Sequence, residues 1–226
     1  MRSLLRFLAG VVLPLALIVV VAQLLRPATV EEPPPPSLEV DEATAPPTEA
    51  PTGGTWRVVA EESFVGYRIE ERDPTRGART NEAVGRTSAV DGGVTVVDGV
   101  VEEATVTAHL TDLESAEPRR DQSIRRRYLE SFEHRRARFE LISPVALDAP
   151  GDEFVVESQV EGRLELRGHT SDLTVDVKAR WDERSARVVG RGRVVLEDYD
   201  ITPPRIAGFR FVADEGDVEF DLTLRR

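Results

Sequence analysis

The sequence predicts an all-β fold, either an antiparallel barrel of about eight strands or a sandwich, with a short helix between two of its strands. A single transmembrane helix is predicted to precede this domain. Three observations lead to these predictions. From residue 55 onward, apolar and polar residues alternate with period two, which is typical of strands with one buried and one wet face. Residues 119–133 break that alternation with helical spacing. Residues 7–25 contain no charge and are long enough to cross a bilayer.

The N-terminal segment 1–26 is interpreted as an uncleaved membrane anchor. Arg2 and Arg6 precede the apolar span, and the chain beyond Arg26 is acidic. The excess of positive charge before the span predicts a cytoplasmic N-terminus and an extracytoplasmic domain. A cleaved signal peptide is the alternative. Its apolar region would be about 7–15 residues long and followed by a small-residue cleavage site, whereas this run is longer and its cleavage site poor.

Residues 27–54 are predicted to be a spacer between the membrane and the barrel. They contain eight prolines, six acidic residues and no aromatic residue. Such a segment buries too little apolar surface to fold by itself, and proline keeps the chain extended.

The strands are expected in the remaining segment, 55–226. In 172–181, for example, Leu173, Val175 and Val177 share one face, while Asp176 and Lys178 lie on the other. Turn signals separate the strands, such as Asp91-Gly92-Gly93 and Asp98-Gly99. The expected strands are 55–60, 63–70, 83–90, 93–97, 100–111, 137–143, 154–167, 172–181, 186–197 and 218–224.

The expected helix carries most of a run of eight arginines between Arg119 and Arg138, although the whole chain of 226 residues has a formal charge of −12. Ile124, Leu129 and Phe132 would share its apolar face. The run therefore predicts a helix with a solvated charged side. Binding of a nucleic-acid backbone is disfavoured because it requires a positively charged surface.

The composition excludes several kinds of chemistry. The chain has no cysteine, so it forms no disulfide, thiolate metal site or cysteine nucleophile. Its three histidines, His109, His134 and His169, have no partner at metal-ligand spacing in the sequence. Glycine-rich phosphate loops and a Gly-x-Ser-x-Gly elbow are absent from the sequence. We therefore expect no metal, no cofactor and no catalytic residue.

The inward faces of the predicted strands are apolar, and several of their residues are small. Gly190 and Gly192 fall on the inward face of 186–197. An eight-stranded barrel is wide enough either to be filled by its own side chains or to hold one small ligand. Small inward residues favour a cavity, and a filled core remains the alternative.

The order of several short motifs resembles the YceI-like family. A first strand carries Ser63, Val65, Tyr67 and Ile69, and a later hairpin carries a Gly-x-Leu-x-x-x-Gly-x-Thr pattern from Gly162 to Thr170. Two departures from the family pattern occur, at His134-Arg135-Arg136 and at Asp200. The other matching motifs are Arg120-Asp121 with Ile124, Tyr128-Leu129-Glu130, Ala137 with Phe139, Tyr199-Asp200-Ile201, and the final strand 217–224.

This resemblance covers 55–226 and implies a lipocalin-like barrel that binds a long isoprenoid or another amphiphilic lipid outside the cytoplasm. Related domains often pair as dimers, so the resemblance includes a homodimer among the expected partners. The resemblance implies no enzymatic activity, and no nucleic-acid partner is expected. Lumen residues expected to contact the lipid are Val65, Tyr67, Ile69, Ile124, Leu129, Phe132, Phe139, Val160, Leu164, Leu166, Gly190, Gly192 and Tyr199. Arg120 and Arg125 are candidates for contact with a lipid head group, because a guanidinium suits phosphate oxygens.

Three functions remain open from the sequence. The first is a membrane-tethered lipid-binding barrel, and the second is an envelope interaction module whose barrel is a filled scaffold. The third is an enzyme that acts on a lipid inside the cavity. Likewise, the arginines of the helix either contact a lipid phosphate or only solvate the helix.

Overall fold

The computed structural model describes residues 32–38, 51, 53–72, 80–147, 155–203, 205–206 and 210–226, except for the side chains of 205–206 and 210–211. All of these residues belong to one unit, Glu32–Arg226. The predicted anchor, 1–26, lies outside the described residues, as does most of the predicted spacer. Within the described ranges, no helix is long and apolar enough to cross a membrane.

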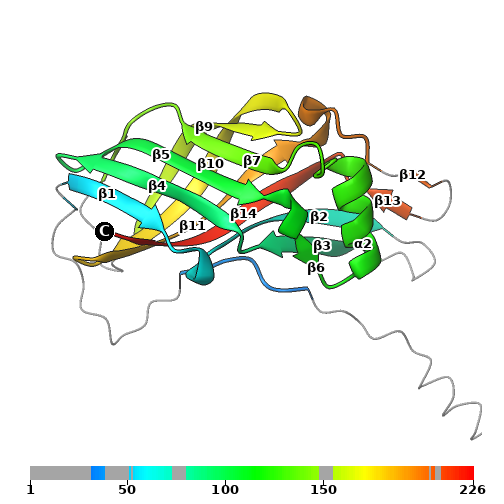
Figure 1. Cartoon of the computed structure of the whole chain (residues 1–226), viewed down its shortest axis with the longest axis horizontal. Helices are drawn as coiled ribbons and strands as arrows, with labels where there is room; N and C mark the ends of the chain where they lie inside the picture. Colours follow the sequence, from blue (N-terminus) through cyan, green and yellow to red (C-terminus); the bar gives the residue numbers. More distant parts are fainter. Residues whose placement is uncertain are drawn as a thin grey trace, which may run out of the picture. The chain divides into compact units, whose positions relative to one another are not determined.

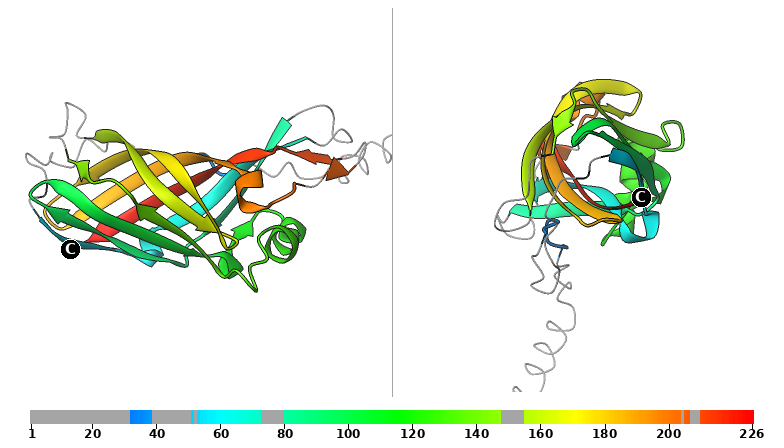
Figure 2. Two further views of the ribbon diagram at one scale, coloured as in Figure 1. Left: turned by 90° about the horizontal axis from the view of Figure 1, so that it is seen from above. Right: turned by 90° about the vertical axis from the view of Figure 1, so that its left-hand side faces the viewer.

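The main body is an antiparallel barrel of eight strands, which confirms the predicted all-β class (Figure 1). Each strand pairs with the next, and β1 closes the ring by pairing with β14 through Arg57 and Val58. The view along the barrel shows the closed ring (Figure 2, right). In spatial order the strands are β1 (Gly53–Val58), β4 (Val90–Val97), β5 (Val100–His109), β7 (Arg136–Leu141), β9 (Val156–Leu166), β10 (His169–Trp181), β11 (Ser185–Val195) and β14 (Glu215–Arg225).

A smaller sheet extends one end of the barrel and carries the helix. β2 (Phe64–Arg72) pairs with the first half of β14, where β1 no longer reaches. β3 (Thr80–Thr87) pairs with β2, and β6 (Glu114–Ser115) pairs with β3. The remaining short elements are β8 (Val145–Ala146), β12 (Arg205–Ile206), β13 (Arg210–Val212), and the 3-10 turns η1 (Ala60–Glu62), η3 (Leu110–Asp112) and η5 (Leu196–Tyr199).

Two tight turns fix the register of neighbouring strands. Asp98 and Gly99 both have positive φ, 48° and 77°, as do Arg167 and Gly168, 53° and 77°. Positive φ at both central residues is the geometry of a type I′ turn, whose twist matches that of antiparallel strands. The Asp98-Gly99 turn therefore lies where the sequence predicted it.

The second predicted turn, Asp91-Gly92-Gly93, was wrong, because these residues lie inside β4. A Cβ on Gly92 would lie 2.2 Å from the carbonyl oxygen of Thr105, and one on Gly93 would lie 2.7 Å from that of Trp56. The glycines are needed because the neighbouring strands approach closely on both sides. The chain bends earlier, at residues 88–89 between β3 and β4.

The helix of the arginine run is shorter than predicted. It consists of α2 (Pro118–Ser123) and one π-helical turn, η4 (Ile124–Tyr128). Pro118 occupies the first turn, where its missing N–H removes no helical hydrogen bond. The N–H of Leu129 donates to Ile124 O over 2.8 Å, and Glu130 then takes a φ of 47°, which ends the helix.

The inward-facing side chains form two apolar clusters. The cluster on the side of η5 and the helix contains Leu110, Leu164, Leu166, Leu173, Val175, Val194, Tyr199 and Ile201. The cluster at the other end, which we call the apolar end, contains Trp56, Val90, Val96, Leu222 and Leu224. Phe220 packs against both clusters, so the two are continuous along the lumen.

Candidate ligand cavity

A cavity of about 650 Å³ occupies the barrel lumen between and beside the two clusters. Its wall is built from the inward positions of the barrel strands, which the period-two pattern made apolar. Small-molecule sites typically have volumes of about 300–1,000 Å³. The volume contradicts a barrel filled by its own side chains, which was the alternative left open by the sequence.

Most of the residues predicted to face the lumen line this cavity. Val65, Tyr67 and Ile69 contribute from β2, and Ile124 and Leu129 contribute from η4 and the residue after it. Whether these side chains contact a lipid stays a prediction. The remaining predicted residues in the lining are Phe139, Val160, Leu164, Leu166, Gly192 and Arg120.

Phe132 was wrongly predicted to face the lumen. It is 60% exposed, and the described lining does not include it. The helix ends before Phe132 because of the positive φ at Glu130, so the helical spacing used for the prediction no longer applies. Arg126 lies over the Phe132 ring instead, with its guanidinium carbon 5.9 Å from the ring centroid.

Gly190 and Tyr199 are also corrections to the predicted lining. A Cβ on Gly190 would lie only 2.5 Å from the ring of Phe220, so an aromatic ring fills the space that the glycine leaves. Tyr199 is 2% exposed and packs in the cluster beside the cavity, outside its described lining. Arg125 turns to the backbone, where its Nη1 donates to Leu113 O over 3.0 Å, and it too lies outside that lining.

Inward glycines covered by aromatic rings recur around the wall. A Cβ on Gly85 would lie 2.4 Å from the Tyr67 ring, and one on Gly162 would lie 2.1 Å from the Phe139 ring. Glycine thus allows a ring on a neighbouring strand to lie flat against the wall. Three of the inward glycines, Gly85, Gly162 and Gly190, therefore shape the cavity through the aromatic rings that they accommodate.

The cavity reaches the surface beside the helix. Arg119 and Arg127 are both exposed, and both line it. We call this region the mouth. At the apolar end, Ala146 lines the cavity and is exposed as well.

Polar groups gather on the wall of the mouth. Arg120 has a side chain that is 11% exposed, and its Nε lies 3.7 Å from Glu71 Oε1, too far for a hydrogen bond. Its Nη1 donates to Glu32 Oε1 over 2.9 Å. Tyr67 Oη, Arg120 Nε and Glu32 Oε2 are buried and find no hydrogen-bond partner among the described residues.

The charges at the mouth fix the protonation of these groups. Burial raises the pKa of the Tyr67 hydroxyl, while the neighbouring positive charge of Arg120 lowers it, and the net shift is upward. Burial lowers the pKa of Arg120, but the hydrogen bond to Glu32 and the charge of Glu71 outweigh it, so its pKa lies above the usual value. Near neutral pH the mouth therefore presents a phenol that can donate a hydrogen bond and a charged guanidinium.

Asp121 holds the helix in place at this end. Its carboxylate is 7% exposed and accepts hydrogen bonds from Ser115 N over 2.9 Å and from Ser115 Oγ over 2.6 Å. Ser115 belongs to β6, so these two hydrogen bonds attach the helix, and with it the adjacent Arg120, to the sheet. The two residues of this Arg-Asp dipeptide thus have separate roles. Asp121 fixes the helix to the sheet, and Arg120 lines the cavity.

Two of the mouth residues were not predicted from the sequence. Glu71 continues the alternation of Val65, Tyr67 and Ile69, so an acid at an inward position was the signal that could have found it. Glu32 lies in the predicted spacer, where the sequence carries no signal of contact with the barrel.

Two histidines have acidic neighbours in space, in contrast to the expectation from sequence: His109 Nε2 lies 3.4 Å from Asp91 Oδ2, and His134 lies beside two glutamates. Ligand atoms of Glu130, Glu133 and His134 lie within 4.8 Å of one another in the turn after the helix. Arg167 already pairs with Glu130, 3.0 Å from Nη2 to Oε1. Such surface groupings are common without an ion, and this one lies apart from the cavity lining that the structure describes.

Comparison with known proteins agrees with this architecture. The model of the YceI-like domain matches residues 56–224. The chain belongs to the YceI-like family. Comparison with curated proteins gives no significant match.

Two solved structures share the fold of this YceI-like domain. One is a polyisoprenoid binding domain from Saccharophagus degradans implicated in plant cell wall breakdown, with 16% identity and a TM-score of 0.57 over 75% of this chain and 97% of that one. The other is BcnA from Burkholderia cenocepacia, also with 16% identity and a TM-score of 0.57, over 74% of this chain and 98% of that one. At these identities the likeness shows a common fold.

Proposed function

We propose that this chain is a membrane-tethered, extracytoplasmic binding protein that holds a long-chain isoprenoid or another amphiphilic lipid in its barrel. The observation that carries the proposal is the shape and chemistry of the cavity. An apolar lumen of about 650 Å³ ends at a mouth that offers a guanidinium and an unpartnered phenol. An apolar chain fits the lumen, and a polar or anionic head group fits the mouth.

Two further facts support a lipid as the ligand. Membership of the YceI-like family and the likeness to a domain described as polyisoprenoid binding agree with an isoprenoid tail. An apolar tail transferred from water gains roughly 0.8 kcal/mol per buried CH₂ group, so a tail of a few isoprene units is enough for stable binding.

The test is to identify what the purified protein carries. The full chain is purified and analysed by native mass spectrometry, and its organic extract is analysed for lipids. We expect a bound species whose mass matches a lipid found in the extract. A chain that carries no lipid and takes up none when offered prenyl alcohols, prenyl phosphates or phospholipids would contradict the proposal.

Tethering to the membrane is a separate part of the proposal. It rests on the uncharged span 7–25 and on the arginines before it. Peptide mapping of the membrane fraction should recover residues 1–26, and protease added outside the cytoplasmic membrane should digest the barrel. A protein whose first residue falls near 27–31 would show that the segment is a cleaved signal peptide.

A further inference from the structure

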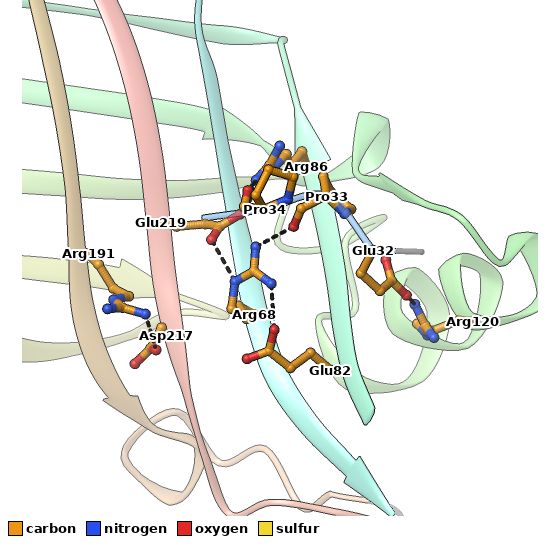
Figure 3. Close-up of polar contacts among 10 residues, drawn as sticks. All are labelled: Glu32, Pro33, Pro34, Arg68, Glu82, Arg86, Arg120, Arg191, Asp217 and Glu219. Atoms are coloured by element: carbon orange, nitrogen blue, oxygen red, sulfur yellow. Dashed lines mark hydrogen bonds and ion pairs between the residues drawn. The ribbon is translucent and has the colours of Figure 1, made fainter. Parts of the chain in front are cut away.

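Part of the predicted spacer lies against the outer wall of the barrel. We call residues Glu32–Leu38 the strap. Arg68 Nη2 donates to Pro33 O, and Arg86 Nη2 donates to Pro34 O, each over 2.7 Å. Figure 3 shows the strap crossing these arginines before its Glu32 reaches Arg120 on α2. Because proline has no N–H, the carbonyls are the backbone groups that such a segment can offer to a partner.

The two arginines that bind these carbonyls are held in place by carboxylates of the same wall. Glu219 lies on the outward face of β14 and is fully buried. Its carboxylate accepts a hydrogen bond from Arg68 Nε over 3.0 Å and one from Arg86 Nη2 over 2.7 Å (Figure 3). Arg68 Nη1 also donates to Glu82 Oε2 over 2.8 Å. The carboxylates orient both guanidinium groups, and each group directs an Nη2 donor to the strap. A buried charge on an outward strand position shows that this wall differs from an ordinary solvated face.

The strap brings a carboxylate to the mouth of the cavity. Glu32 pairs with Arg120, and their side chains are 13% and 11% exposed. This contact leaves three buried polar atoms without partners among the described residues: Glu32 Oε2, Arg120 Nε and Tyr67 Oη. A buried polar atom without a hydrogen bond is costly, so a ligand that offers acceptors to Arg120 and Tyr67 would be preferred to Glu32.

We propose that Glu32 occupies the position of an anionic lipid head group, and that such a head group displaces it from Arg120 and releases the strap. This inference rests on the proposed lipid-binding function and adds a competing ligand within the chain. Coupling between two ligands is reciprocal. A docked strap therefore lowers the affinity for anionic lipids, and a bound anionic lipid weakens docking of the strap. A neutral lipid with the same tail does not compete with Glu32 for Arg120, and it leaves the strap docked.

The first test compares two probes with one tail and different head groups. Binding of geranylgeranyl pyrophosphate and of geranylgeraniol is measured with the full chain in one detergent. Glu32→Gln should tighten pyrophosphate binding by about fivefold or more and leave the alcohol unchanged. Glu61→Gln, an exposed acid away from the cavity lining, is the control and should change neither affinity. Inorganic pyrophosphate alone tests whether the head group is sufficient.

A second variant separates release of the strap from simple electrostatics. Arg86 donates to Pro34 and does not line the described cavity. Arg86→Ala removes a positive charge, which by charge alone would weaken anion binding. Release of the strap predicts the opposite, a tighter pyrophosphate complex. Arg86→Lys keeps the charge but loses the guanidinium fork that binds Glu219 and Pro34 O together. It should tighten pyrophosphate binding in the same direction by a smaller factor, and it serves if the alanine variant does not fold.

The mobility of the strap is measured by electron spin resonance with a nitroxide attached to the cysteine that Ser37→Cys introduces. The chain has no other cysteine, so the label attaches at one position. The docked strap should give a slow-motion spectrum. Geranylgeranyl pyrophosphate should shift it to fast motion, as should Arg86→Ala without ligand, whereas geranylgeraniol should not. Arg120→Gln should abolish the preference for the pyrophosphate over the alcohol.

The outcomes separate the two proposals. If both probes bind and Glu32→Gln changes neither affinity, or if the pyrophosphate binds without mobilising Ser37→Cys, the strap is a static support and the inference is overturned while lipid binding stands. If neither probe binds to the wild type or to Glu32→Gln, lipid binding of this class and the inference fail together. In that case the spectrum of Arg86→Ala still shows whether the wall holds the strap.

Discussion

The two ends of the lumen are built on different principles. At the apolar end, Trp56, Leu222 and Leu224 are each no more than 5% exposed and pack as an apolar core, in which Trp56 Nε1 is buried without a hydrogen-bond partner among the described residues. At the mouth, Tyr67, Glu71 and Arg120 line the same cavity and place charges and an unpartnered hydroxyl on its wall. The first arrangement stabilises the fold. The second leaves polar groups available to something that enters.

This difference gives a bound amphiphile a direction. Its tail would extend toward the apolar end, where burial is favourable regardless of the detailed contacts. Its head would remain at the mouth, where Arg120 can form a charge-assisted hydrogen bond. Substitutions at the apolar end should therefore change stability, and substitutions at the mouth should change binding.

The largest effect is expected from Trp56→Ala at the apolar end. Trp56 is 3% exposed, and removing a buried tryptophan side chain typically costs about 3–5 kcal/mol. Phe132→Ala, beyond the helix at the mouth, removes a ring that is 60% exposed and should change the free energy of unfolding by less than about 0.5 kcal/mol. Chemical denaturation of the full chain measures both. Similar losses would show that the exposed ring has a packing role.

The next effect is on binding, from Leu129→Asp at the mouth. Leu129 lines the cavity, and a charged group there would oppose an apolar tail by at least about 1–3 kcal/mol, or roughly tenfold in affinity for geranylgeraniol. Arg126→Ala is the control, because Arg126 is exposed and outside the described lining. Equal losses from the two variants would mean that a ligand does not contact the cavity wall at Leu129.

A glycine pair gives a smaller effect on stability. Gly85→Ala would place a Cβ 2.4 Å from the Tyr67 ring, so the ring must move, at a cost of about 1–3 kcal/mol. Gly53→Ala, on β1, meets only Val96 O at an ordinary 3.4 Å and should be almost neutral. Thermal unfolding of the two variants compares them. A neutral Gly85→Ala would show that the Tyr67 ring has room to shift.

The smallest effect on stability is expected from Tyr67→Phe. Its hydroxyl has no hydrogen-bond partner among the described residues, so removing it should leave the free energy of unfolding unchanged or raise it by up to about 1 kcal/mol. The same variant should bind geranylgeranyl pyrophosphate more weakly, because a donor at the mouth is lost. A clear loss of stability would reveal a partner for the hydroxyl and contradict its proposed role in ligand binding.

The pH dependence of Tyr67→Phe provides an independent check. Burial raises the pKa of the Tyr67 hydroxyl above the usual value of about 10 for tyrosine. A raised pKa in the folded state contributes stability that is fully present below the unfolded pKa and is lost as pH rises through the folded value. Relative to Tyr67→Phe, the wild type should therefore lose stability above about pH 10. Parallel curves for the two proteins would argue against a buried hydroxyl.

Some features of the site were accessible from sequence because they follow from local periodicity. Alternation placed Val65, Phe139 and Leu164 on inward faces, and all three line the cavity. Helical spacing likewise brought Ile124 and Leu129 to it. The spacing failed at Phe132, since no local pattern announced the left-handed Glu130 that ends the helix.

The sequence alone determined the all-β class, the inward and outward identity of most strand positions, and the motif order of the YceI-like family. Those features depend on neighbours within a strand or a helix. Only the tertiary structure decided whether a glycine opens space, and neither Gly190 nor Gly192 does: a Cβ on Gly190 would lie 2.5 Å from the Phe220 ring, and one on Gly192 would lie 2.9 Å from Thr174 O and 3.1 Å from the Leu173 side chain. Only the tertiary structure showed that the strap docks on the barrel. Glu32 contacts Arg120 across 88 residues, and Arg68 contacts Glu219 across 151. Contacts between residues so far apart in the sequence leave no local pattern that could predict them.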